Sequence, residues 1–137
     1  MIKNVYFFFF LLLIISCKDE KDSFEENYTW HKIEVIATAY NSVKNQTDSN
    51  PNTTAFGDSL KPGMKYVAVS NDLIKKGLKH NTPIKIEGFV DIYFVKDKMH
   101  YRKKNHIDIY MGIDVNAAKT WGRKKISIEY GSPKGTP

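Results

Sequence analysis

The chain has 137 residues, with 21 Lys+Arg against 15 Asp+Glu and a net charge of +6. Apolar residues make up 42% and charged residues 26%, values near the globular average that exclude a mostly disordered chain. The length leaves room for one ordinary domain, and the single cysteine excludes a disulfide framework or a cysteine-based zinc cluster within the chain.

The N-terminal segment has the pattern of a secretion signal. Lys3 precedes an unbroken apolar run over residues 5–15, which is too short to span a bilayer comfortably. The sequence IISC at 14–17 resembles the lipobox of bacterial lipoprotein signals, in which a small residue precedes the lipidated cysteine. We therefore predict a signal peptide over 1–16 and a lipid anchor on Cys17 that attaches the protein to a membrane. The alternatives are an ordinary signal peptide and an N-terminal membrane anchor.

The segment after this cysteine is acidic. Residues 18–29 hold five acids and two bases without apolar periodicity, so we predict a flexible tether over 17–29. Its first residues, KDE at 18–20, resemble the surface-export signal of lipoproteins in the Bacteroidetes group. That resemblance implies an outer-membrane lipoprotein exposed at the cell surface. The alternative is a solvated linker, which leaves a periplasmic orientation open.

One basic domain is predicted over 30–130, followed by a flexible tail over 131–137. Residues 30–137 hold 18 Lys+Arg and 10 Asp+Glu, a net charge of +8, and a basic domain attracts anionic partners. Because an exported lipoprotein rarely meets nucleic acid, we expect a cell-wall glycan or a membrane surface and no nucleic acid. The alternative is that the lysines only keep the surface soluble.

Short strands dominate this domain. β-forming residues and partial alternation predict strands over 31–40, 65–69, 83–87, 91–95, 107–111 and 125–130. The turn-rich segment over 41–62 is predicted to be a long surface loop. Helices are expected at 72–78 and at 114–121, where Asp114 suits the N-cap and Gly122 the C-terminal position. Six short strands with two small helices indicate a mainly-β fold, a compact barrel.

Two aspartates are the candidate acid/base residues. Asp97 follows an apolar strand, and Asp108 lies between Ile107 and Ile109, so that Asp108 and Tyr110 share the opposite face of their strand. A carboxyl in a partly apolar cleft has a raised pKa and can act as a general acid. A second carboxylate nearby raises that pKa further. The alternative is a solvated aspartate on the outer face of an edge strand.

Further candidates for substrate contact lie near these aspartates. Thr38 and Tyr40 share one strand face, and a hydroxyl beside an aromatic ring suits a sugar; alternatively, Tyr40 is a half-buried barrel aromatic. Lys98, with the bases at 102–104, would hold an anionic substrate or form a solvated loop. The four histidines lack metal-ligand spacing, so we predict surface histidines, no metal and no cofactor.

These residues, taken in order, resemble a known family. Thr38-Ala39-Tyr40, the segment at 65–69, Asp97, IDIY at 107–110 and AAKTWGR at 117–123 resemble the 3D domain family, named for three aspartates. The resemblance covers about residues 35–129. It implies a six-stranded double-psi β-barrel, similar to the barrels of rare lipoprotein A, the expansins and the catalytic domain of membrane-bound lytic transglycosylase A.

The resemblance also implies an enzyme that acts on peptidoglycan. Asp108 corresponds to the family's last aspartate, the catalytic acid/base. It would protonate the glycosidic oxygen between N-acetylmuramic acid and N-acetylglucosamine, then accept the proton of the C6 hydroxyl that closes a 1,6-anhydro ring. Asp97 would raise the pKa of Asp108 or stabilise the transition state. The candidates for substrate binding are Thr38, Tyr40, Lys98 and Tyr110.

Two departures from the family pattern keep other functions open. Ser70 stands where the family's first aspartate usually lies, and Asp97-Lys98-Met99-His100 replaces its Asp-Thr-Gly-Gly. The lost glycines put side chains where a glycan would approach the backbone. The alternative to a lytic transglycosylase is therefore a non-catalytic peptidoglycan- or glycan-binding barrel, and a further one is an envelope factor that works by protein contacts. We expect a monomer.

Overall fold

The computed structural model describes residues 19–43 and 50–135. The predicted signal segment at 1–16 and the lipidation candidate Cys17 lie outside the described residues and remain predictions. Among the described residues, no helix is both long enough and apolar enough to cross a membrane.

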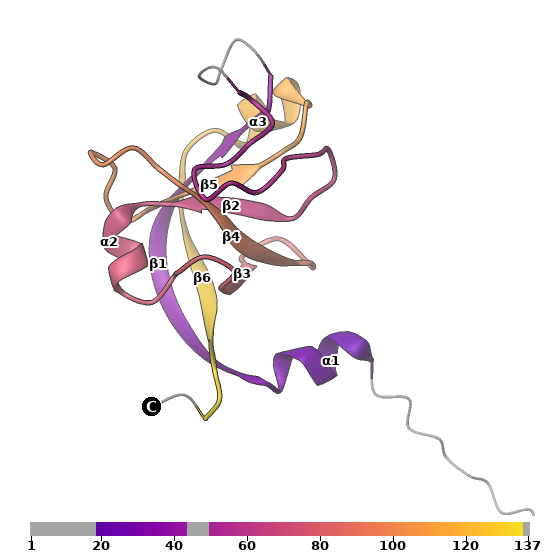
Figure 1. The fold of residues 1–137 in the computed structure, drawn as a ribbon, viewed down its shortest axis with the longest axis vertical. Helices are drawn as coiled ribbons and strands as arrows, with labels where there is room; N and C mark the ends of the chain where they lie inside the picture. The colour runs from indigo at the N-terminus through magenta and orange to yellow at the C-terminus, as the bar shows by residue number, and fades with distance from the viewer. Residues whose placement is uncertain (1–18, 44–49, 136–137) are drawn as a thin grey trace, which may run out of the picture.

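Six strands close into one barrel (Figure 1). Around the barrel the order is β1-β5-β2-β4-β3-β6. β1 pairs in parallel with β5, and β2 with β4, whereas the other four neighbouring pairs are antiparallel. This confirms the predicted mainly-β fold with six strands. The strands are β1 (Tyr28–Tyr40), β2 (Tyr66–Val69), β3 (Pro83–Ile86), β4 (Ile92–Lys98), β5 (His106–Tyr110) and β6 (Lys124–Pro133).

Apolar side chains at alternate strand positions form the interior. On β5, Ile107 and Ile109 are fully buried, and they pack with Val67 and Val69 of β2 and with other branched residues. Because successive side chains of a strand point to opposite faces, Asp108 between the two isoleucines points away from this apolar interior. The core therefore fixes the side of β5 on which Asp108 lies.

Three short helices accompany the barrel: α1 (Glu20–Glu25), α2 (Asn71–Lys75) and α3 (Val115–Trp121). The N-cap predicted for α3 is confirmed, because the Asp114 side chain accepts a hydrogen bond from the backbone N–H of Ala117 at 2.9 Å. Gly122 follows at φ 67°, a conformation that favours glycine. Helix α1, at the end of the barrel opposite α3 (Figure 1), was not expected from the sequence.

The structure differs from the flexible tether predicted over 17–29. Within the described part of that segment, α1 occupies residues 20–25 and β1 begins at Tyr28. The Phe24 ring centroid lies 5.0 Å from that of Tyr28 and 6.1 Å from that of Phe94, and Glu25 pairs with Lys85. The acidic composition suggested a solvated linker, but one aromatic anchor and one ion pair attach the helix to the barrel.

The predicted tail at 131–137 is also partly a strand. β6 continues to Pro133, which pairs with Tyr28 of β1, so the sheet runs over 28–133 instead of 30–130. Gly131 allows this pairing, because a Cβ there would lie 3.0 Å from the Tyr28 ring. The two long strands form the ribbon that extends toward α1 in Figure 1.

We predict that Phe24→Ala lowers the free energy of unfolding by about 1–2 kcal/mol, because it removes a partly buried ring from the contact with Tyr28 and Phe94. Urea unfolding followed by circular dichroism measures this loss. Ser23→Ala, at an exposed position of the same helix, is the control and should leave the midpoint unchanged. Equal midpoints for both variants would mean that α1 does not stabilise the barrel.

Candidate functional site

Asp97 and Asp108 line the same pocket, which has a volume of about 280 Å³. The register explains how they meet, because Ala68 of β2 pairs with Asp97 of β4 on one side and with Asp108 of β5 on the other. The two aspartates are thus two strand spacings apart, about 10 Å between Cα atoms. The other lining residues are Tyr40, Ala68, Lys98, Met99, His100 and Lys103.

A β-bulge turns Asp97 toward this pocket. Val67 pairs with Val95, but the next residue of β2, Ala68, pairs with Asp97, so Lys96 is the extra residue. In an unbroken strand, Asp97 would share the face of Val95, which is fully buried in the core. The bulge shifts the alternation by one residue and re-aims the side chain. The sequence placed Asp97 just after a strand, whereas the structure places it within β4.

The Asp108 carboxyl is held by a threonine from the neighbouring strand. The Thr38 hydroxyl donates a hydrogen bond to Asp108 Oδ1 at 2.9 Å, and the two residues are partners in the β1–β5 register. Burial raises the pKa of Asp108 to about 6, although the Thr38 hydrogen bond and the charge of Lys103 act in the opposite direction. A substantial fraction of this carboxyl is therefore protonated near pH 6.

Backbone amides hold the Asp97 carboxylate. Its Oδ1 accepts hydrogen bonds from Ala55 N at 2.7 Å and from Lys98 N at 2.8 Å. Burial raises the pKa of Asp97, the two amides lower it, and the negative charge of Asp58 raises it. The two carboxyls thus lie in different environments, one bound by a side-chain hydroxyl and the other by main-chain N–H groups.

The segment over 50–60 is attached to the barrel by Asp58. Its carboxylate accepts from His80 Nε2 at 2.5 Å and from Lys96 Nζ at 3.3 Å, and the Phe56 ring stacks on His80 with 4.8 Å between centroids. This attachment brings the Ala55 amide to Asp97. The turn-rich composition predicted only a long surface loop here, because ion pairs between residues far apart in the chain leave no local pattern.

We predict that Asp58→Asn speeds hydrogen exchange at the Ala55 amide about tenfold, because the ion pairs that hold this segment weaken. Amide exchange followed by NMR measures the rate. Asp91→Asn is the matched control, since it removes an exposed ion pair with Lys65 away from the pocket. An unchanged Ala55 rate in Asp58→Asn would show that Asp58 does not attach the segment.

Three of the four residues predicted to contact a substrate lie at the pocket of the two aspartates. Thr38 bonds to Asp108, and Tyr40 and Lys98 line the pocket. Within the described residues, the buried Tyr40 hydroxyl has no hydrogen-bond partner, and burial raises its pKa, with Asp97 and Asp108 adding to the effect.

Tyr110, by contrast, does not line this pocket. It is 3% exposed, its hydroxyl shares a hydrogen bond of 2.7 Å with the Ser42 hydroxyl, and it lines a separate pocket. Its ring lies 5.3 Å from that of Tyr40, so it supports Tyr40 instead of facing the two aspartates. Tyr110 shares a strand face with Asp108, but it is bonded to Ser42 and lies outside the pocket of the two aspartates, so its role in substrate binding stays a prediction.

His106 also differs from its prediction as a surface histidine. It is 2% exposed, and its Nε2 lies 2.8 Å from Thr38 Oγ1. Burial and, to a smaller extent, the positive charges of Lys103 and Arg123 together lower its pKa to about 4. Strict alternation along β5 places it on the face of Asp108, a signal that its basic sequence neighbours concealed.

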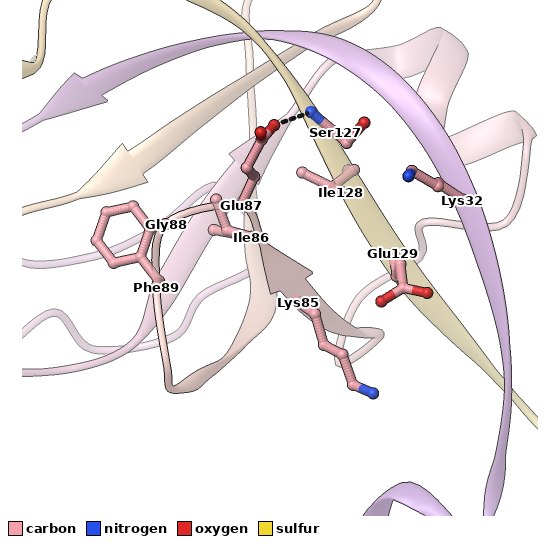
Figure 2. Close-up of a pocket in the computed structure, with 9 residues that line it drawn as sticks. All are labelled: Lys32, Lys85, Ile86, Glu87, Gly88, Phe89, Ser127, Ile128 and Glu129. Carbon is pink, nitrogen blue, oxygen red and sulfur yellow. Dashed lines mark hydrogen bonds between the residues drawn. The ribbon is translucent and has the colours of Figure 1, made fainter.

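A larger pocket of about 440 Å³ lies elsewhere on the barrel, between β3 and β6 (Figure 2). Two of its charged side chains are engaged by the fold. Glu87 accepts from Ser127 N at 2.8 Å, and Lys85 pairs with Glu25 and lies 4.1 Å from the centre of the Trp30 ring. We assign the candidate site to the smaller pocket, because two carboxyls with raised pKa values meet there. Within the described parts of the chain, no cluster of His, Cys, Asp and Glu is arranged to hold a metal ion.

The chain is similar to solved structures but not to the sequences of characterised proteins. No family model and no characterised protein matches the chain by sequence. The apo expansin of Clavibacter michiganensis is similar over 78% of this chain, with 21% identity and a TM-score of 0.46. A mutant of that expansin in complex with cellohexaose gives 20% identity and a TM-score of 0.47 over the same share. The chain matches about half, 53%, of each of these structures.

Proposed function

We propose that the barrel binds a glycan strand of the bacterial cell envelope, peptidoglycan or a related anionic glycan, in the pocket of Asp97 and Asp108. The observation that carries this proposal is the meeting of two carboxyls, an aromatic ring and two lysines in one open pocket. Carboxyls accept hydrogen bonds from sugar hydroxyls, and the Tyr40 ring offers an apolar surface beside them. Within the described residues, Lys98 and Lys103 have no ion-pair partner, so both are free to attract an anionic substituent.

A second candidate function is cleavage of that glycan, and the raised pKa of Asp108 favours it. A carboxyl that is partly protonated near neutral pH suits a general acid. Asp108 would donate its proton to the glycosidic oxygen as the bond from C1 to that oxygen breaks, and the leaving sugar would depart as a hydroxyl. The Asp108 carboxylate would then take the proton of the C6 hydroxyl as the C6 oxygen attacks C1 and closes a 1,6-anhydro ring. The Asp97 carboxylate would stabilise the positive charge that develops on the sugar.

The proposal includes a fold type and a location. Two parallel strand pairs, β1–β5 and β2–β4, within one closed six-stranded barrel support the double-psi barrel of the 3D family. The lipobox-like sequence that ends at Cys17 supports a lipoprotein of the outer membrane. Binding of a glycan at that membrane accounts for a basic domain on an exported chain.

Co-sedimentation with purified sacculi tests the proposal. The full-length protein in mild detergent is expected to bind, and Lys98→Ala with Lys103→Ala is expected to weaken binding about tenfold, because two unpaired charges at the pocket are lost. The matched control is Lys32→Ala with Lys124→Ala, which removes the same charge elsewhere. Equal losses in both double variants, or no binding by the wild type, would refute a glycan site at this pocket.

Mass spectrometry of the same incubations separates binding from cleavage. Anhydro-muropeptides that appear with the wild type and are absent with Asp108→Ala would establish the second candidate function. Binding without such products leaves a glycan-binding module.

A further inference from the structure

His106 and Thr38 form a hydrogen-bonded chain that ends on Asp108. His106 begins β5 two residues before Asp108, so both point to the same face. Its Nε2 lies 2.8 Å from Thr38 Oγ1, and the same oxygen lies 2.9 Å from Asp108 Oδ1. The proposed function assigns no role to this buried histidine, although it lies one side chain away from the candidate acid.

The number of protons available determines which group donates in each of these two hydrogen bonds. A threonine hydroxyl has one proton to donate and lone pairs that accept. If the Thr38 proton lies toward Asp108, the hydroxyl must accept from His106, and Nε2 must carry a hydrogen. A neutral imidazole has only one N–H, so the ring is then in the Nε2–H tautomer with Nδ1 unprotonated.

The surroundings of His106 favour a neutral ring and a fixed position. Burial, with a smaller effect of the nearby positive charges of Lys103 and Arg123, lowers its pKa to about 4, so the ring is uncharged near pH 7. The main chain is clamped by Ser70, whose Oγ accepts from His106 N at 3.0 Å and whose N–H donates to His106 O at 2.9 Å. Ser70 is itself fully buried.

We propose that His106 is a positioning residue for the candidate site: its Nε2–H donates to Thr38 and thereby commits the Thr38 hydroxyl proton to Asp108 Oδ1. With Oδ1 occupied in this way, the proton of the Asp108 carboxyl resides on Oδ2, the oxygen left for a ligand. That Oδ2 meets a glycan rests on the proposed function, whereas the directions of the two hydrogen bonds do not.

Nitrogen NMR of the histidine side chains in the wild-type protein tests whether His106 donates to Thr38 or accepts from it. The expected spectrum of His106 is that of the neutral Nε2–H tautomer from pH 5.5 to pH 8. An Nδ1–H tautomer would overturn the proposal, because Nε2 would then accept the Thr38 proton and Asp108 would receive none.

A double-mutant cycle tests whether His106 acts through Thr38. Asp108 is titrated by the carbon shift of its carboxyl in the wild type, His106→Leu, Thr38→Val and the double variant. Because a hydrogen bond to the charged form lowers a carboxyl pKa, Thr38→Val is expected to raise the Asp108 titration midpoint by about one pH unit. His106→Leu is expected to raise it by a smaller amount, because the Thr38 hydroxyl can still donate to Asp108 but is no longer oriented and polarised by the Nε2–H. The double variant should match Thr38→Val alone.

His106→Gln provides the rescue. Its side-chain amide can still donate to Thr38, so the Asp108 midpoint should return to near the wild-type value. Full additivity in the cycle, or an Asp108 titration unaffected by His106→Leu, would overturn the proposal. If His106→Leu does not fold, the wild-type tautomer and the His106→Gln titration decide it. Since no glycan is present in these measurements, a failure of sacculus binding would refute the proposed function and leave this inference standing.

Discussion

Replacing Asp108 by asparagine is expected to make the protein more stable at neutral pH and to weaken the proposed binding of a glycan at this pocket. Burial raises the pKa of Asp108 to about 6, above the ordinary value of 3.8 that the unfolded chain retains. Between about pH 4 and pH 6 the folded state therefore binds more protons than the unfolded state, and stability falls as pH rises. Above pH 6 the folded protein carries the full cost of a buried charge.

Asparagine removes this charge and keeps an oxygen that can accept from Thr38. We predict that the free energy of unfolding of Asp108→Asn exceeds that of the wild type by about 1–3 kcal/mol at pH 7 and by little at pH 4. Urea unfolding at both pH values measures the difference. Asp91→Asn, at an exposed carboxyl, should show no such gain. A stability loss at pH 7 in Asp108→Asn would mean that the carboxylate stabilises the fold and is not a strained functional group.

Ile109→Ala is expected to cost about 3–4 kcal/mol of unfolding free energy, a large part of the stability of a domain of this size. Ile109 is fully buried on β5, where it pairs with Ala39 of β1 and Val67 of β2. Its truncation leaves a cavity beside the strand that carries Asp108 and His106. Chemical unfolding measures the loss, and the exposed Ile113 supplies the control, since Ile113→Ala should change stability by less than about 0.5 kcal/mol.

The two isoleucine variants also test the alternation of β5. If Ile109→Ala and Ile113→Ala cost the same, Ile109 does not lie in the barrel interior, and the orientation of Asp108 toward the pocket loses its basis. A cost confined to Ile109 supports the alternation that separates the core face from the site face.

The alternation of apolar and polar residues along the strands made much of the fold predictable from the sequence, and with it the placement of Asp108, one of the two site aspartates. Ile107 and Ile109 flank Asp108, so a buried strand and a carboxyl on its opposite face follow from local spacing alone. The cap at Asp114 is equally local. Non-local features were not predictable in this way: the bulge at Lys96 that turns Asp97 depends on how β4 pairs with β2.

The same limit explains His106 and α1. His106 lies beside several bases in the sequence, which suggested a solvated loop. Its burial depends on contacts with Thr38 of β1 and with Ser70, which caps α2. Helix α1 is acidic, and its attachment depends on Phe24 meeting Phe94 across a long stretch of chain. In both cases, the charged composition predicted an exposed segment, but contacts with residues distant in the sequence determined the structure.

An NMR titration of the isotope-labelled protein with soluble peptidoglycan fragments tests the central claim most directly. A glycan bound in the candidate pocket predicts amide shifts that saturate at Tyr40, Asp97, Lys98 and Asp108 and leave the β3–β6 pocket unperturbed. Shifts centred on Lys32 and Glu129 of that second pocket (Figure 2), or no saturable shift at the two aspartates, would contradict it.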